Sequence, residues 1–269
     1  MSTLVRYGVS AGIVRLTLDS PQNRNALSTA LVTQLHDGLR SAAADPTVRC
    51  VILGHEGGTF CAGADLGEAA GREPGDVAVD RAREMTRLLR AILELPVPVI
   101  GAIDGHVRAG GLGLVGACDV VVAGPSSTFA LTEARIGVAP SIISLTLLPK
   151  MSARAAGRYF VTGERFGAAE AADIGLITIA ADDVEARVAA LAAEVAKGSP
   201  QGLAASKALT TAAILDGFDR HADSLTEQSA RLFVSDEARE GILAFLEKRS
   251  PNWTPSWSPA RLRNRVTGQ

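Results

Sequence analysis

Strand and helix patterns alternate along the first two-thirds of this chain. Residues 4–8 and 12–19 are rich in β-branched side chains of alternating polarity, which predicts a hairpin. Two largely apolar runs, 48–56 and 97–103, predict buried strands. Apolar residues at helical spacing predict a helix that begins at Asn25 or Ser28 and ends before Pro46, then helices at 76–95 and 110–118, with a short strand at 119–123.

The last third of the chain has almost only helical patterns. They predict a short strand at 176–180 and helices at 144–151, 153–160, 168–173, 183–197, 201–216, 221–233 and 236–248. Strands that alternate with helices are typical of an α/β core, which we place at 1–195. We expect a helical region used for assembly at 196–250 and an extended tail at 251–269, where prolines interrupt any periodicity.

Composition excludes several classes of protein. Lys and Arg number 27 against 29 Asp and Glu, so the net charge of −2 argues against a nucleic acid or an anionic membrane as partner. With 47% apolar residues, the chain is not intrinsically disordered. The three cysteines and four histidines show no zinc-site spacing, so no metal is expected. Neither a secretion leader nor an apolar run of about 20 residues is present, which predicts a cytoplasmic protein.

The segment GGTFCAGADL, residues 57–66, is a first candidate site. A strand that runs into a loop of small residues and then a helix leaves backbone N–H groups unpaired, and these can bind an anion or an oxyanion. The alternative is an ordinary turn with Asp65 as helix cap, which composition alone favours. Cys61 has no histidine near it in sequence and is expected to be a buried thiol rather than a nucleophile.

A second candidate lies in GHVRAGGLGLVG, residues 105–116. Residues 111–116 match the dinucleotide-binding pattern GxGxxG, with Glu133 as a possible ribose ligand. The short helix and the loop before it count against that alternative. Glu133 itself lies in an apolar stretch, where burial would raise its pKa and suit it to acid/base catalysis. The alternative is a solvated glutamate at a helix start.

In order and spacing these segments resemble the crotonase, or enoyl-CoA hydratase/isomerase, superfamily. The resemblance rests on PQNRNAL, FCAGADL, GHVRAGGLGLVGACDVVVA, FALTEARIGVAP, GERFGAAEAADIGLI and FLEKRSPNW, which span nearly the whole chain. It implies a crotonase-like α/β fold, a ββα superhelix whose C-terminal helices assemble a homotrimer or homohexamer. It also implies an acyl-CoA thioester as substrate and no separate cofactor, since coenzyme A is part of the substrate.

The resemblance also implies roles for individual residues. Two backbone N–H groups, on Ala62 and Gly110, would hold the thioester oxygen, and Glu133 would be the acid/base. Contacts to CoA fall on Arg24, Ala26, Ala64, Asp65, Leu66, Phe245 and Lys248, of which the last two would reach the CoA of a neighbouring subunit. For Lys248, a solvated helix end is an equal alternative.

One departure from the family pattern concerns Gly113. The well-known hydratases hold a water between two glutamates, of which the second maps onto Glu133 and the first onto Gly113. One carboxylate can still move a proton along an acyl chain, whereas hydration loses a group worth about 10²–10⁴ in rate. Because the surrounding pattern also looks like members described as hydratases, we expect hydration of a 2-enoyl-CoA. The alternatives are isomerisation of 3-enoyl- to 2-enoyl-CoA and acyl-CoA binding without turnover. Arg108 and His106 receive no role.

Overall fold

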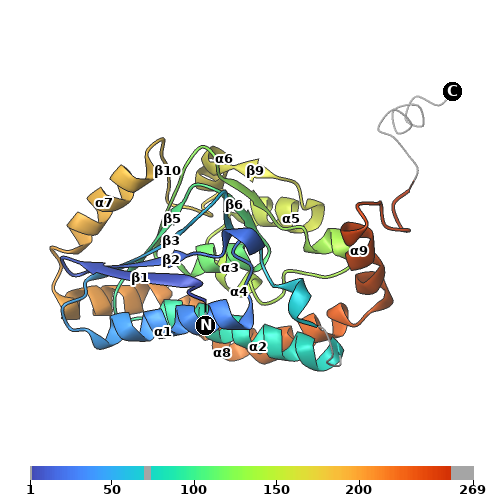
Figure 1. The fold of residues 1–269 in the computed structure, drawn as a ribbon, viewed down its shortest axis with the longest axis horizontal. Helices are drawn as coiled ribbons and strands as arrows, with labels where there is room; N and C mark the ends of the chain where they lie inside the picture. Colours follow the sequence, from blue (N-terminus) through green and yellow to red (C-terminus); the bar gives the residue numbers. More distant parts are fainter. Residues whose placement is uncertain (1, 70–73, 256–269) are drawn as a thin grey trace.

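The computed structural model describes residues 2–69 and 74–255 and folds them into two β-sheets with helices around them (Figure 1). Among these residues the larger sheet has six strands: an antiparallel hairpin, as expected, followed by parallel strands. Its order is β1 (Val5–Ser10), β2 (Ile13–Leu18), β3 (Cys50–His55), β5 (Val99–Ile103), β7 (Val120–Ala123) and β10 (Ile179–Ala180). This arrangement confirms the predicted α/β class.

Most helices begin and end close to the predicted positions, but the helix expected at 144–151 ends at Leu147 and one predicted break is absent. They are α1 (Thr29–Ala44), α2 (Pro74–Glu94), α3 (Gly110–Ala117), α4 (Ser144–Leu147), α5 (Ala153–Thr162), α6 (Ala168–Asp173), α7 (Val184–Val195), α8 (Pro200–Phe233) and α9 (Asp236–Leu246). The predicted break between 201–216 and 221–233 is wrong, because α8 runs through it. Phe218, at the expected break, is only 1% exposed. Burial of this ring outweighs the weak helix propensity of Gly217.

The parallel strands of the larger sheet are buried on both faces. On one face, Ile52 and Ile100 belong to a cluster with Val188 of α7. On the other, Val51 and Leu53 join the main core, together with residues of α1. Figure 1 shows α7 and α1 on opposite sides of the sheet. Residues alternate between faces along a strand, so a sheet covered on both sides needs the largely apolar runs that predicted these strands.

A second sheet was not among the predicted elements. It consists of β4 (Thr59–Cys61), β6 (His106–Arg108), β8 (Thr128–Ala130) and β9 (Phe166–Gly167), in that order. The first three run parallel, and each follows a strand of the larger sheet in the chain: β4 follows β3, β6 follows β5, and β8 follows β7. A helix comes next each time, namely the 3₁₀ turn η2 (Leu66–Ala69), α3 and the 3₁₀ turn η3 (Glu133–Ile136). The chain thus repeats strand, strand, helix, and the carboxyl ends of β4, β6 and β8 meet at one edge.

The long helix α8 lies along α2 (Figure 1) and is fixed to the core by a buried lysine. Lys207 is 5% exposed, and its Nζ donates to the Ile92 carbonyl at 2.8 Å and to Asp119 Oδ2 at 2.8 Å. A buried charge requires such partners, so this contact holds the helical region in place. Among the described residues, no helix is both long and apolar enough to cross a membrane. Most of the predicted tail, 256–269, lies outside the described residues.

Candidate active site

Three loops meet at the carboxyl edge of the smaller sheet, and each contains one of the predicted catalytic residues. Ala62 follows β4, Gly110 begins α3 after β6, and Glu133 begins η3 shortly after β8. Neighbouring strands of a sheet lie about 4.8 Å apart. The order β4, β6, β8 therefore places Gly110 between the other two residues. The fold brings together residues that are distant in the chain.

The loops after β4 and β6 touch at Gly63. A Cβ on Gly63 would stand 2.7 Å from the Cβ of Ala109 and 3.3 Å from the amide nitrogen of Gly110. Gly63 also has a φ of +91°, a conformation that side chains disfavour. Only glycine fits at this position, so the main chain of the first loop passes directly beside the Gly110 N–H.

The turn that precedes Gly110 is strained. Ala109 has a φ of +46° and a ψ of −122°, although it is not a glycine. Such a conformation costs about 1–3 kcal/mol and persists only where the surrounding structure imposes it. The turn connects β6 to α3 and so sets the direction of the Gly110 N–H, which is the first of its helix and has no intrahelical acceptor.

The main-chain hydrogen bonds show that one of the two predicted backbone donors is wrong. The Ala62 N–H donates to the Arg24 carbonyl at 3.1 Å and is therefore not free for a ligand. In the part of the chain that the structure describes, the N–H groups of Ala64 and Gly110 have no acceptor. These two residues lie on either side of the contact at Gly63. Ala64 thus replaces Ala62 as the partner of Gly110 in a pair of free main-chain donors.

Glu133 is buried at the start of η3. It is 8% exposed, and its Oε2 atom is buried without a hydrogen-bond partner among the described residues. Burial raises the pKa of this carboxyl to about 7, because removal from water disfavours the charged form. The alternative of a solvated glutamate is therefore wrong. A carboxyl that titrates near neutral pH can both take up and release a proton.

The charge of Glu133 is not neutralised by Arg135, its neighbour in sequence. Arg135 is exposed, and its Nε donates to the Thr162 carbonyl at 3.0 Å. The helix α9 instead covers η3 closely, since a Cβ on Gly241 would stand 2.5 Å from the carbonyl carbon of Ile136. This packing covers the Ile136 end of η3, whereas Ala134 and Arg135 of the same turn are exposed.

Apolar side chains surround Gly113, the position where the resemblance places the first glutamate of the hydratases. Gly113 lies one turn after Gly110 on α3. A Cβ on Gly113 would stand 2.6 Å from Cγ2 of Ile143 and 3.3 Å from Cδ1 of Leu89. Ile143 is 5% exposed and Leu89 is fully buried. We call Gly113, Ile143 and Leu89 the apolar wall; it leaves no room for a second carboxylate.

Most of the residues predicted to contact CoA lie around the loop after β4. Arg24 and Ala64 are exposed, whereas Ala26 is buried. The Asp65 carboxylate accepts the Gly67 N–H at 2.9 Å and caps η2, so the turn interpretation of this segment is correct for Asp65. The side chain of Leu66 lies outside the described part of the structure. The contacts of these residues with CoA stay predictions.

Asn25 positions this region and was missed as a functional residue. Its side chain is fully buried; Oδ1 accepts the Ser20 N–H at 2.7 Å, and Nδ2 donates to the carbonyls of Glu56 and Thr59 at 3.0 and 2.8 Å. These bonds fix the loop that contains Arg24 against β4. Asn25 is not the cap of α1, because Ser28 accepts the N–H of the first turn instead. The sequence offered one indication of this role: an asparagine side chain can donate and accept hydrogen bonds at the same time.

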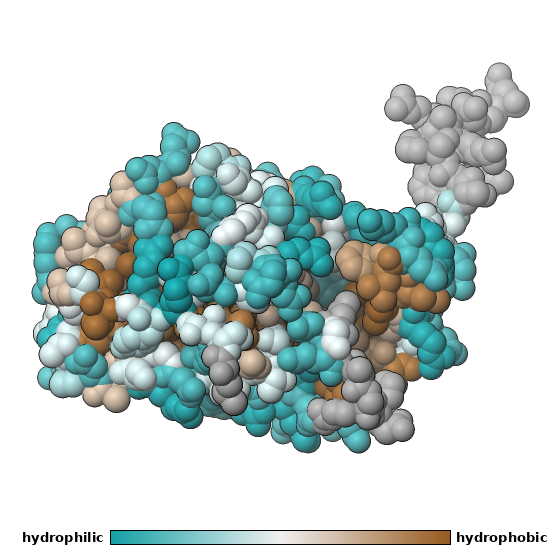
Figure 2. Space-filling model, in the orientation of Figure 1, coloured by the Kyte–Doolittle hydropathy of each residue, from teal (hydrophilic) through white to brown (hydrophobic). Residues whose placement is uncertain are grey.

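Phe245 and Lys248, predicted to reach a neighbouring subunit, lie at the exposed end of α9. Phe245 is 60% exposed, and Leu243 and Leu246 beside it are 45% and 63% exposed. In Figure 2 apolar side chains gather on the surface where Figure 1 places α9. The assembly of subunits and the contact of these residues with a second subunit's CoA stay predictions.

The structure gives little support to a nucleophilic cysteine, a dinucleotide site or a metal site. Burial raises the pKa of the Cys61 thiol to about 12, which confirms the interpretation as an unreactive core thiol. The helix α3 has only eight residues, too few for the crossover of a dinucleotide-binding unit. Among residues 2–69 and 74–255, no group of three His, Cys, Asp or Glu side chains could hold a metal ion.

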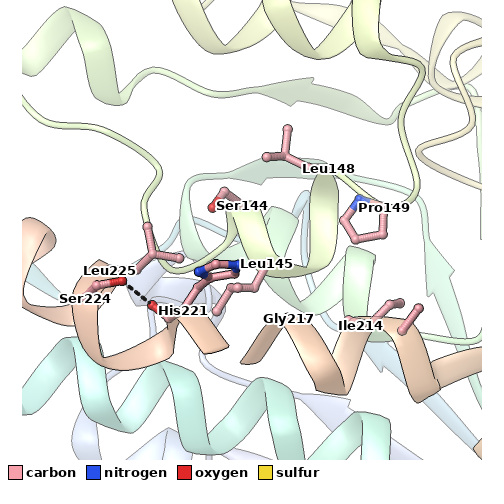
Figure 3. A pocket seen from close by; sticks show the side chains of 10 residues that line it. Ser144, Leu145, Leu148, Pro149, Ile214, Gly217, His221, Ser224 and Leu225 are labelled. Carbon is pink, nitrogen blue, oxygen red and sulfur yellow. Dashed lines mark hydrogen bonds between the residues drawn. The ribbon is translucent and has the colours of Figure 1, made fainter. Parts of the chain in front are cut away.

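A separate groove of about 340 Å³ lies between α4 and α8 (Figure 3). Its lining is mainly apolar and includes Leu145, Leu148 and Ile214. His221 also lines it, and the main-chain carbonyl of His221 accepts the Ser224 hydroxyl at 3.0 Å. None of the predicted site residues lines this groove, so it is not part of the candidate active site.

Comparison with known proteins agrees with the resemblance. The family description "Enoyl-CoA hydratase/isomerase" matches residues 8–256. The chain is 36% identical over 254 residues to a "Probable enoyl-CoA hydratase" of Rhodobacter capsulatus, covering 93% of this chain and 97% of that protein. It is 31% identical over 261 residues to the "1,2-epoxyphenylacetyl-CoA isomerase" of Escherichia coli, covering 94% and 99%. The crystal structure of a "Putative enoyl-coA hydratase" from Mycobacterium avium paratuberculosis superimposes with a TM-score of 0.90 at 69% identity, covering 94% of this chain and 100% of that one.

Proposed function

The chain belongs to the enoyl-CoA hydratase/isomerase family, and from this premise we propose that it moves a proton next to the carbonyl of an acyl-CoA thioester, with Glu133 as its single carboxyl acid/base. The observation that supports this most directly is the meeting of two free main-chain donors, on Ala64 and Gly110, with a buried glutamate at one sheet edge. The acyl-CoA contacts expected of Arg24 and its neighbours belong to the same proposal.

The two N–H groups would hold the thioester oxygen. Removal of a proton from C2 of the acyl chain turns the thioester into an enolate, whose oxygen gains negative charge. Fixed donors stabilise that charge more than they stabilise the neutral carbonyl, and loss of one such donor typically costs about 10²–10³ in rate. The strained turn at Ala109 keeps the Gly110 donor in place before substrate arrives.

Glu133 would exchange the proton. As a carboxylate it removes the proton from C2, and as a carboxylic acid it returns that proton elsewhere on the chain. Its raised pKa, about 7, keeps both forms accessible at neutral pH. Because Oε2 has no hydrogen-bond partner among the described residues, we expect it to meet the substrate.

The apolar wall favours isomerisation of a 3-enoyl- to a 2-enoyl-CoA. In that reaction Glu133 takes a proton from C2, the electron pair moves through the dienolate, and the same proton is added at C4 while the double bond shifts to C2–C3. One carboxyl suffices, and no water has to be held. The contact of Gly113 with Ile143 leaves a water without the second carboxylate that would orient it.

Hydration of a 2-enoyl-CoA, which the sequence led us to expect, is the second candidate. The names of relatives such as the Rhodobacter capsulatus protein favour it. Glu133 would then take a proton from water as the hydroxyl adds to C3, and deliver that proton to C2. With a single carboxyl acting twice, we expect this reaction to be slower by about 10²–10⁴ than with two groups.

A paired assay tests the proposal. Purified protein is given a 3-enoyl-CoA, and appearance of the conjugated thioester absorbance is followed. In the matched experiment it is given the corresponding 2-enoyl-CoA, and loss of the same absorbance is followed. We expect the first rate to exceed the second over short, branched and long acyl chains. Tight binding of acyl-CoA with neither signal would instead indicate a binding protein without turnover and would overturn the proposal.

A further inference from the structure

The outer face of the smaller sheet has a group of cationic side chains that the proposed reaction does not use. Val107 is fully buried, so His106 and Arg108, on either side of it in β6, point to the opposite face. Thr128 of β8 pairs with His106, and Ala130 with Arg108. Arg165 directly precedes β9 and continues the antiparallel register opposite Ala130. The two arginines thus lie in one row, with a small residue between them.

Arg108 uses only part of its hydrogen-bonding capacity within the protein. Its Nη1 donates to the carbonyls of Val107 and Thr128 at 2.8 and 2.6 Å, and its Nη2 donates to Thr128 Oγ1 at 2.8 Å. A guanidinium has five N–H donors in a planar fork. The remaining two, one on Nε and one on Nη2, lie along the same edge and have no acceptor among the described residues. That edge fits two oxygens of a phosphate or carboxylate.

His106 offers a further donor on the same face. Thr128 Oγ1 accepts from Arg108 and lies 2.9 Å from His106 Nδ1. The tautomer of the His106 ring sets the direction of this second hydrogen bond. With Nδ1 as acceptor, the neutral ring has its proton on Nε2. His106 is exposed. In that tautomer, every remaining polar group of the cluster is a donor.

The positive charge of the cluster is not compensated within the described residues. Neither Arg108 nor Arg165 forms an ion pair there, and Glu164, next to Arg165 in sequence, is bonded to Arg158 instead. Burial and the charge of Arg165 lower the pKa of the half-buried Arg108. A cation held partly out of water beside a second cation is unfavourable until an anion joins them.

We propose that Arg108, His106 and Arg165 form a binding site for a phosphate group, separate from the thioester site. The donors outnumber the two oxygens of a carboxylate and suit the three oxygens of a tetrahedral phosphate. His106 and Thr128 are the first residues of β6 and β8, whereas Gly110 and Glu133 follow the last. The phosphate site therefore lies on the outer face and extends from these first residues to Arg108, the last residue of β6.

Calorimetric titration with inorganic phosphate at constant ionic strength tests the proposal. We expect saturable binding of one phosphate per chain, weakened at least tenfold by Arg108→Gln and by Arg165→Gln. Arg165 is exposed and makes no hydrogen bond in the described structure, so its replacement leaves the fold intact even if Arg108→Gln does not. Arg158→Gln, which removes an exposed arginine already paired with Glu164, is the matched control and should leave the affinity unchanged.

Three results would each overturn the proposal. The first is absence of saturable phosphate binding, and the second is an affinity that Arg165→Gln does not change. The third is tighter binding of succinate than of phosphate in the same titration, which would assign the site to carboxylates.

Discussion

The Cγ2 methyl of Ile143 lies 2.6 Å from the point where a Cβ on Gly113 would stand. Real side-chain atoms do not approach so closely, so any residue other than glycine at 113 must displace Ile143 or the main chain that bears it. Gly113 and Ile143 are thirty positions apart in the sequence, yet they form one structural unit. The absence of a second carboxylate is therefore a property of the packing of this site and not of one position.

This contact predicts how a second glutamate can be introduced. Gly113→Glu alone should lower stability and give no gain in hydration, because overpacking a core typically costs about 1–3 kcal/mol. Gly113→Glu combined with Ile143→Gly removes the clash and should raise the rate of 2-enoyl-CoA hydration at least tenfold over the parent protein. Absorbance assays with 2-enoyl-CoA, together with thermal unfolding of both variants, measure these effects.

Ile143→Gly by itself is the control for that experiment. It opens space without adding a carboxyl and should not raise hydration. If it accelerates hydration as much as the double variant does, the gain comes from space for water, and the role assigned to the second carboxylate is wrong.

The larger elements could be predicted from the sequence because their signals are local. The long apolar runs at β3 and β5 and the helical spacing along α1 sufficed. The strands β4, β6 and β8 have only three residues each, too few for alternation to be recognised. The sequence supplied Glu133 and the loop at 57–66 as candidates, and single backbone donors through the resemblance, but it could not place these residues in space.

Two details of the site depend on contacts that leave no local trace in the sequence. Ala62 and Ala64 are identical residues on either side of Gly63, and only the bond from Ala62 to the Arg24 carbonyl distinguishes the paired donor from the free one. Likewise, Gly113 reveals that a carboxylate is absent but not that Ile143 occupies its place.

The pKa of Glu133 predicts the pH dependence of isomerisation. Proton removal from C2 requires the carboxylate, which forms above a pKa of about 7 in the free protein. The value of kcat/KM for a 3-enoyl-CoA should therefore rise with pH and level off above about pH 8. A profile that is already flat from about pH 5 upward would show that Glu133 titrates as an ordinary exposed carboxyl.

Titration of Glu133 should lower the stability of the protein as pH rises, whereas it raises kcat/KM. Its pKa is raised from 4.5 in a free carboxyl to about 7 in the folded protein. Between these values the folded state binds more protons than the unfolded state, so the free energy of unfolding falls as pH rises through that range. Denaturant unfolding at about pH 5 and pH 8 should show a smaller loss of stability for Glu133→Gln than for the parent protein. Equal losses in the two proteins would contradict the raised pKa.

The contact at Gly63 predicts a sharp difference between two glycine substitutions. Gly63→Ala places a Cβ against Ala109 and in a left-handed conformation that costs about 1–2 kcal/mol, and it displaces the loop from the Gly110 N–H. We expect loss of stability and at least a tenfold loss of kcat. Gly157→Ala, on the exposed side of α5 with nothing within 4 Å of its Cβ, should stabilise the protein by about 0.5–1 kcal/mol and leave kcat unchanged. Thermal unfolding and initial rates compare the two.

The central claim, that one carboxyl transfers the proton, is tested most directly by the rate of 3-enoyl-CoA conversion in Glu133→Gln. We expect a rate lower by about 10²–10⁴, with the affinity for the acyl-CoA unchanged in a separate titration. Glu227→Gln, which alters an exposed glutamate on α8, should keep the parent rate. A Glu133→Gln protein that converts the substrate at nearly the parent rate would contradict the account.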